Sequence, residues 1–205
     1  MHPTVILFDL GGVLLDVVSA RRLSTLMEER LPIEEVARRW TQSKYLKLFE
    51  SGQCGSMAFA AGVMEELGLH MPAEAFLAEF ERFIAGFYPG APALLKAIPG
   101  SYTMACLTDT NEIQWRSLCA RVSIDRYFKH TFLSYEIGHM KPNPQVYAHV
   151  IQKLGCAPGQ ILYLDDNPAN VEAGREAGMQ AQRTVGLSEV RAALEGAGIL
   201  LTDHL

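Results

Sequence analysis

The stretch Val5-Ile6-Leu7-Phe8-Asp9-Leu10-Gly11-Gly12-Val13 decides the fold of this chain. Its first four residues have the length and composition of a fully buried strand, and the two glycines end that strand abruptly. Asp9 therefore lies at the carboxyl edge of the first predicted strand, where open α/β sheets bind their ligands. A carboxylate in that place can act as a nucleophile or as a metal ligand. Two residues further on, where a second acid would help, the chain has Gly11.

The composition of the 205 residues is that of an ordinary globular protein, with 49% hydrophobic and 20% charged residues. The formal net charge is −5, and no basic stripe is present, so we expect no nucleic-acid partner. The first residues lack a basic leader and are interrupted by Asp9 and Asp16, which predicts neither a signal peptide nor a membrane span. The four cysteines have no C-x-x-C spacing, a pattern typical of reduced thiols in a cytoplasmic protein.

A helical pattern without a convincing strand runs from about residue 20 to residue 87. Breaks at Pro32, at 51–53 and at 68–72 divide it into several helices. We expect residues 17–87 to form a helical cap inserted after the first strand. Residues 1–16 and 88–205 then form an α/β catalytic core.

Strands and helices alternate in the remainder of the chain. The predicted strands cover 102–108, 131–134, 161–164 and 181–185, and predicted helices cover 112–120, 144–154 and the segment opened by Asn167-Pro168. This alternation predicts a Rossmann-like, mostly parallel sheet that is flanked by helices.

Four polar points follow predicted strands: Asp9, Thr108-Asp109, Lys141 and Asp165-Asp166. In a doubly wound sheet the carboxyl ends of the strands face one crevice, so we expect these points to converge there.

Together these residue types suit phosphoryl transfer. Asp9 would attack phosphorus and form an aspartyl-phosphate intermediate. Asp165 or Asp166, together with Asp9 and a backbone carbonyl, would hold a hard cation, for which Mg²⁺ is the best candidate. Lys141 would offset the repulsion between the carboxylates and an anionic substrate, and the Thr108 hydroxyl would donate to the phosphoryl oxygens.

Four ordered segments carry a resemblance to a known family, and they span nearly the whole chain. They are Phe8-Asp9-Leu10-Gly11-Gly12-Val13, Leu107-Thr108-Asp109-Thr110-Asn111, Met140-Lys141-Pro142-Asn143-Pro144-Gln145-Val146-Tyr147 and Leu164-Asp165-Asp166-Asn167-Pro168-Ala169-Asn170-Val171. The sequence is similar to the haloacid dehalogenase superfamily of phosphohydrolases. Within it, the segments most resemble sugar-phosphate phosphatases of the glucose-1-phosphatase type.

The resemblance implies a Mg²⁺-dependent hydrolase of a small phosphorylated metabolite. It implies that Asp9 is the nucleophile, and that Asp166 is the main metal ligand of the fourth segment, supported by Asp165 and Asn170. The backbone carbonyl of Gly11 is a further candidate ligand.

By the same resemblance, Thr108 and Lys141 bind the phosphoryl group. Two positions depart from the family pattern: Gly11 stands where phosphatases carry a second aspartate, and Asp109 stands where asparagine is common. General acid–base catalysis raises a reaction rate roughly 10²–10⁴-fold, so the loss of the second aspartate slows turnover without abolishing it. Candidate proton sources are Asp109, Asp16, a cap residue and water. The simpler interpretation of Asp109 is a loop residue that uses only its backbone amide.

Two alternatives to a phosphatase follow from Gly11. A metal-independent 2-haloacid dehalogenase needs no second acid, although the Asp165-Asp166 pair argues against it. A non-catalytic phospho-ligand-binding protein is the other alternative. Within the helical segment, Trp40, Tyr45 and Phe49 are expected in the cap core, whereas Lys44, Lys47 and residues 50–55 are candidates to face the site. No oligomeric state is predicted.

Overall fold

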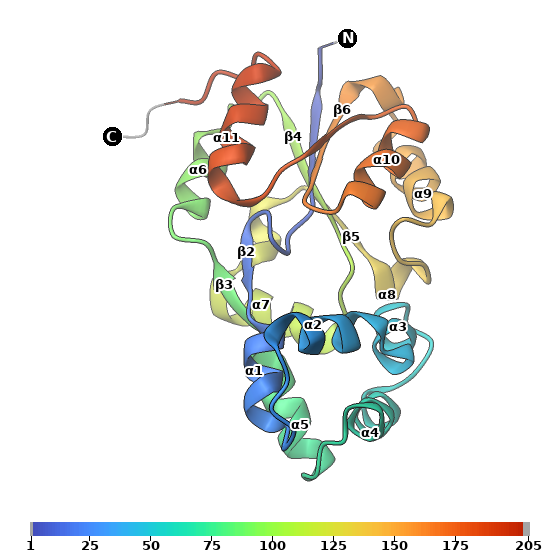
Figure 1. The fold of residues 1–205 in the computed structure, drawn as a ribbon. Helices are drawn as coiled ribbons and strands as arrows, with labels where there is room; N and C mark the ends of the chain where they lie inside the picture. The colour runs from blue at the N-terminus through green and yellow to red at the C-terminus, as the bar shows by residue number, and fades with distance from the viewer. Residues whose placement is uncertain (1, 203–205) are drawn as a thin grey trace.

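The computed structural model describes residues 2–202 as a parallel sheet between two layers of helices, with a further helical unit beyond the carboxyl ends of the strands (Figure 1). In spatial order the sheet contains β5 (His130–Leu133), β4 (Thr103–Thr108), β1 (Val5–Phe8), β6 (Ile161–Asp165) and β7 (Gln180–Arg183). Every neighbouring pair of these strands is parallel. The predicted Rossmann-like α/β fold is therefore confirmed.

The central strand β1 is buried on both faces. Ile6 and Phe8 belong to the hydrophobic core on one side of the sheet, whereas Val5 and Leu7 belong to the core on the other side. Successive side chains of a strand point to opposite faces, and helices cover both faces here. This is why the strand appears in the sequence as an unbroken apolar run.

Helices of the two layers fill these two cores. α6 (Ala91–Ala97), α7 (Glu112–Val122) and α11 (Gly186–Gly196) pack on the face of Phe8, whereas α9 (Pro144–Leu154) and α10 (Pro168–Glu176) pack on the face of Leu7. The predicted caps are present, because Asn143 and Asn167 each accept a backbone N–H at the start of their helix. Short helical turns complete the core: η2 (Ile124–Tyr127), α8 (Ser134–Ile137) and η3 (Pro158–Gln160).

The helical unit has a hydrophobic core of its own. It consists of α1 (Ser19–Leu26), α2 (Ile33–Gln42), α3 (Lys44–Glu50), α4 (Ser56–Leu67), α5 (Ala73–Phe80) and η1 (Glu81–Phe83). Phe49 and Phe59 stack at 4.6 Å between ring centroids, and Trp40 packs edge-on against Phe83 at 5.4 Å. These aromatic contacts hold the short helices together. Among residues 2–202, no helix is long and apolar enough to cross a membrane.

One feature of this segment contradicts the sequence prediction. A two-stranded antiparallel sheet, β2 (Leu15–Val17) and β3 (Ile84–Phe87), joins the helical unit to the core, although no strand was expected between residues 20 and 87. The Ile84–Phe87 stretch has no polar–apolar alternation of its own, and Gly86 lies opposite Asp16. Its extended form depends on pairing with a segment far away in the sequence, which a local pattern cannot reveal.

Candidate active site

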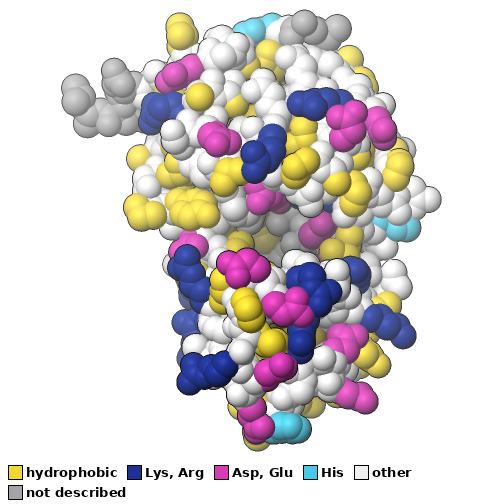
Figure 2. Space-filling model, viewed as in Figure 1, with side chains coloured by type: hydrophobic (Ala, Val, Ile, Leu, Met, Phe, Trp, Pro, Cys, Tyr) yellow, Lys and Arg dark blue, Asp and Glu magenta, His cyan; other side chains and the backbone are white. Residues whose placement is uncertain are grey.

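The predicted site residues converge at the carboxyl edge of the central strands. Phe8 of β1 is in register with Cys106 of β4 and Leu164 of β6, so Asp9, Thr108 and Asp165 emerge close together. A cavity of about 200 Å³ opens there between the sheet and the helical unit, and Figure 2 shows the hollow between these two parts. Its lining includes seven of the predicted residues: Asp9, Gly11, Thr108, Asp109, Lys141, Asp166 and Asn170.

Lys141 is the central cation of this site. Its ammonium Nζ lies 2.7 Å from Asp9 Oδ1, 2.7 Å from Asp165 Oδ2 and 3.2 Å from the carbonyl oxygen of Leu107. The lysine side chain is only 2% exposed. Burial alone would lower the pKa of Lys141, but the carboxylates of Asp9 and Asp165 raise it above its usual value, so the ammonium stays charged.

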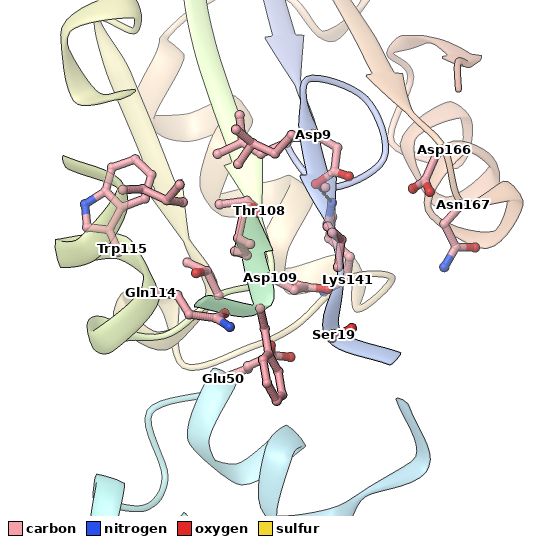
Figure 3. Close-up of a pocket in the computed structure, with 18 of the residues that line it drawn as sticks. Asp9, Ser19, Glu50, Thr108, Asp109, Gln114, Trp115, Lys141, Asp166 and Asn167 are labelled. Atoms are coloured by element: carbon pink, nitrogen blue, oxygen red, sulfur yellow. Dashed lines mark hydrogen bonds and ion pairs between the residues drawn. The ribbon is translucent and has the colours of Figure 1, made fainter. Parts of the chain in front are cut away.

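Asp9 is buried at the end of β1 and faces the cavity from above in Figure 3. Burial raises the pKa of Asp9 to about 7, with the Asp165 and Asp166 carboxylates adding to the rise and the Lys141 ammonium opposing it. The backbone N–H of Asp9 donates to the carbonyl of Leu164 at 2.8 Å and so fixes the residue to β6. Asp9 is thus a buried carboxylate held in one place.

Asp165 has protein partners for both of its oxygens. Oδ1 accepts the backbone N–H of Asn167 at 2.8 Å, and Oδ2 accepts the hydroxyl of Tyr163 at 2.5 Å beside the Lys141 ammonium. The Asn170 amide donates to both oxygens, at 3.1 and 3.2 Å. Asp166 differs, since it is less buried, faces the cavity and has no side-chain donor on its carboxylate within residues 2–202.

The donor set at this edge fits a hard divalent cation. Carboxylate oxygens of Asp9, Asp165 and Asp166 lie within 4.8 Å of one another. The side-chain oxygen of Asn170 is buried beside them without a hydrogen-bond partner. Oxygen ligands of this kind are those that Mg²⁺ prefers, and the Lys141 ammonium is bonded to Asp9 and Asp165 but not to Asp166.

Gly12 provides the space that Asp166 occupies. Its φ of +71° is a backbone conformation that favours glycine. A Cβ atom at this position would lie 2.5 Å from Asp166 Oδ2 and 3.0 Å from Asp166 Cγ. The second glycine of the opening stretch therefore ends the strand and also admits the Asp166 carboxylate.

The Asp109 side chain has a structural role in the loop network. Its Oδ1 accepts the backbone N–H of Lys141 at 3.0 Å, so Asp109 helps to position the loop that carries the lysine. The interpretation that Asp109 uses only its backbone amide is therefore wrong, because the folded loops bring its carboxylate against a main chain 32 residues away. Burial raises the pKa of Asp109, against the opposing effect of Lys141.

Glu50 is a further cavity residue, at the last position of α3. Burial raises the pKa of Glu50 to about 8, and the nearby Asp109 adds to the rise. The hydroxyl of Ser134 donates to the Glu50 carbonyl at 2.5 Å, which fastens this end of α3 to the core. Glu50 opens the 50–55 segment that the sequence offered as a candidate to face the site, and it is the member of that segment that lines the cavity.

Some of the residues of the helical unit that were candidates to face the site line the cavity, and others do not. Trp40 is a core residue, as predicted, and also lines the cavity. Lys44 and Lys47 line a neighbouring hollow beside His139, which shares Lys141 with the cavity. Ser19, Gln114 and Trp115 line the cavity without any sequence motif that would have singled them out.

Comparison with known proteins gives a family match and several relatives. The model of the haloacid dehalogenase-like hydrolases matches residues 3–178. The chain is 23% identical over 185 residues to a D-ribitol-5-phosphate phosphatase of Bacteroides thetaiotaomicron, covering 85% of this chain and 88% of that protein. It is 29% identical over 217 residues to phosphoglycolate phosphatase 1 of Pseudomonas aeruginosa, covering 99% and 77%.

Among solved structures, a family enzyme from Bacteroides thetaiotaomicron in complex with magnesium and inorganic phosphate has a similar fold. The TM-score is 0.74 at 22% sequence identity, and the match covers 88% of this chain and 93% of that one. At this level of identity the likeness concerns the fold.

Replacing Gly12 by alanine is expected to weaken divalent-cation binding at least tenfold, because the new Cβ displaces the Asp166 carboxylate. Titration calorimetry with MgCl₂ measures this. Gly155→Ala is the matched control, since Gly155 has a similar φ of +64° and a Cβ atom there would meet no other atom within 4 Å. Equal Mg²⁺ affinity in the two variants would refute this role of Gly12.

The raised pKa of Glu50 predicts a pH-dependent stability. A glutamate with a pKa of about 4.3 when unfolded and about 8 when folded is protonated only in the folded state between these values, so stability falls as pH rises through this window. Glu50→Gln removes that loss. The difference in Tm between this variant and the parent should therefore increase by at least about 2 °C from pH 5 to pH 9, in favour of the variant. Thermal melts of the exposed Glu65→Gln variant, which should follow the parent at every pH, provide the comparison.

Proposed function

The chain belongs to the haloacid dehalogenase-like hydrolases, and from this membership we propose that it is a magnesium-dependent phosphomonoesterase of a small phosphorylated metabolite. The observation that carries the proposal is the meeting of Asp9, Lys141 and the Asp165-Asp166 pair at one cavity. The names of the relatives support it, because a ribitol-5-phosphate phosphatase and a phosphoglycolate phosphatase both act on small phosphate esters.

In the proposed reaction, a carboxylate oxygen of Asp9 attacks phosphorus. The bond from phosphorus to the ester oxygen breaks, the alcohol leaves after gaining a proton, and an aspartyl phosphate forms. Water then attacks phosphorus, the bond to the Asp9 oxygen breaks, and inorganic phosphate leaves as the carboxylate is restored. Lys141 lowers the repulsion that the anionic ester meets, and the Thr108 hydroxyl donates to a phosphoryl oxygen.

We propose Asp9, Asp166 and the Gly11 carbonyl as the residues that hold Mg²⁺, with Asp165 orienting Lys141 and Asn170 beside them. The carboxylate of Asp166, without a side-chain donor among residues 2–202, and the fully bonded carboxylate of Asp165 support this division. When bound, Mg²⁺ supplies positive charge to the phosphoryl oxygens as phosphorus exchanges its partners. The magnesium and phosphate in the Bacteroides structure support the choice of metal.

We propose residues 17–87 as a cap over a core formed by 1–16 and 88–205. Their separate hydrophobic cores and the placement of Glu50 in the cavity support this division. We propose the cytoplasm as the location, since all four cysteines are free thiols.

The proton for the leaving alcohol is the open step of the proposed mechanism. Gly11 has no acidic side chain. The Asp109 carboxylate accepts the backbone N–H of Lys141, and Asp16 is absent from the cavity lining. Glu50, the acidic residue of the helical unit in the cavity lining, lies across the cavity from Asp9 in Figure 3, so water from the cavity is the proton source that these contacts favour. Esters with good leaving groups would then react faster than simple alkyl phosphates.

Asp9→Asn is expected to lower phosphate release at least roughly 10³-fold, because the nucleophilic oxygen is lost. A phosphate assay with 4-nitrophenyl phosphate and MgCl₂ measures this, and excess chelator should abolish parental activity until Mg²⁺ is restored. Asp125→Asn, at an exposed aspartate, is the control. Full activity in purified Asp9→Asn refutes the mechanism, whereas chelator-insensitive chloride release from 2-chloropropionate would establish the dehalogenase alternative.

Gly11→Asp is expected to raise kcat for alkyl phosphates about tenfold, which is less than the usual worth of a general acid, roughly 10²–10⁴-fold. The gain is limited because a Cβ at Gly11 lies 3.2 Å from Val17 Cγ2, so the valine must shift. Gly11→Asn has the same shape without a transferable proton and should show no gain. Steady-state kinetics with an alkyl phosphate and 4-nitrophenyl phosphate test this, and equal rates in both variants would exclude a missing acid as the limit.

A further inference from the structure

The end of the cavity remote from Asp9 has a distinct composition. We name this end the distal wall and define it by Ser19, Trp40, Glu50, Phe83, Gln114 and Trp115. In Figure 3 the labelled members Ser19, Glu50 and Gln114 lie below Asp9, whereas Trp115 flanks the cavity from the left. A phosphate ester with its phosphorus at Asp9 would direct the rest of the molecule toward this wall.

The distal wall has no basic side chain. The whole cavity lining contains four acidic residues and one basic residue, Lys141, and this lysine is bonded to Asp9 and Asp165. Lys44 and Lys47, on the same helix as Glu50, line a neighbouring hollow that shares only Lys141 with the cavity. A second anionic group on the substrate would therefore lose its hydration beside Glu50 and Asp109 without a cation to pair with.

Glu50 also has unused hydrogen-bonding capacity. Its carboxyl group makes no hydrogen bond to the described residues, although its backbone carbonyl is fixed by Ser134. Glu50 is half-buried and lines the cavity, so its carboxyl group is available to bond to an occupant. A hydroxyl suits the role, since it both donates and accepts.

The remaining members of the distal wall fit a hydroxylated chain. Ser19 offers a further hydroxyl, while the rings of Trp40, Phe83 and Trp115 offer apolar surface for C–H groups. The cavity of about 200 Å³ suits a small metabolite.

From this juxtaposition we propose that the distal wall, through Glu50, selects phosphate esters whose far end is uncharged and hydroxylated, and rejects esters that carry a second anion there. The inference rests on the proposed phosphomonoesterase function and names its substrate class. Polyol and sugar phosphates belong to the favoured class, whereas phosphorylated carboxylic acids belong to the rejected one.

Two esters that differ only at the far end test the proposal: D-ribitol 5-phosphate and 5-phospho-D-ribonate. The chain contains two tryptophans, Trp40 and Trp115, and both line the cavity, so intrinsic fluorescence reports binding without turnover. Binding is measured on the Asp9→Asn protein with Mg²⁺. We expect the alcohol to bind at least tenfold more tightly than the acid.

Changes at Glu50 should alter this preference. In the Asp9→Asn background, Glu50→Gln should reduce the ratio of the affinity for D-ribitol 5-phosphate to that for 5-phospho-D-ribonate. Glu50→Lys should reduce this ratio at least tenfold, because a cation then faces the carboxylate of the ribonate ester. Glu65→Lys, at an exposed position of α4, should leave it unchanged. Equal binding of the two esters, binding of neither, or a ratio insensitive to both Glu50 variants would overturn the proposal.

A third ester, 1-amino-1-deoxy-D-ribitol 5-phosphate, checks the requirement for an uncharged end. Tighter binding of this amine than of the alcohol would overturn the assignment to hydroxyls. The proposed function is tested separately by phosphate release from the parent enzyme. Selective binding without any phosphate release would refute the phosphomonoesterase while leaving the selectivity in place.

Discussion

The contact on which the rest of the site depends is the Lys141 ammonium held between Asp9 and Asp165, 2.7 Å from each. These groups are almost fully buried, and breaking a buried ion pair from one side typically costs about 3–5 kcal/mol. The lysine thus allows two carboxylates to share the edge of β1 and β6. It also ties the loop before α9 to the central strands, so the arrangement of charges and the packing of the loop depend on each other.

A second constraint is spatial and acts at Gly12. The Asp166 carboxylate occupies the volume where any side chain at this position would lie, and the backbone there has a positive φ. Gly11 and Gly12 therefore differ in how much space each has for a side chain, although they are neighbours. Position 11 would tolerate a side chain if Val17 moved, whereas position 12 has room for none. Gly11 leaves the site without an acidic side chain at this position, and Gly12 leaves room for the Asp166 carboxylate.

The sequence predicted the parallel core well, because its signals are local: an apolar run for β1, and Asn–Pro helix starts at Asn143 and Asn167. The convergence of Asp9, Lys141 and Asp166 followed from strand topology alone. Non-local contacts escaped prediction. The pairing of β2 with β3 needs two distant segments, and the bond from Asp109 to the Lys141 backbone exists only once two loops have met. The role of Glu50 likewise depends on how α3 docks on the core.

The docking of the helical unit uses its main chain more than its side chains. Ser134 donates to the carbonyl of Glu50 at 2.5 Å, and Gln114 donates to that of Phe80 at 3.3 Å. Arg121 donates to the carbonyl of Ile84, in the strand β3 that follows the unit, at 2.9 Å. These bonds need particular donor side chains on the α/β core, namely Ser134, Gln114 and Arg121. The acceptors are backbone carbonyls, which every residue type has, so the side chains at the accepting positions are free to differ. The residue at position 50 can therefore change the chemistry of the distal wall without loosening the contact that positions it. Lys141 with its two ion pairs and Glu50 lie in parts of the molecule that have separate hydrophobic cores, so the residue at position 50 can change while those ion pairs stay intact.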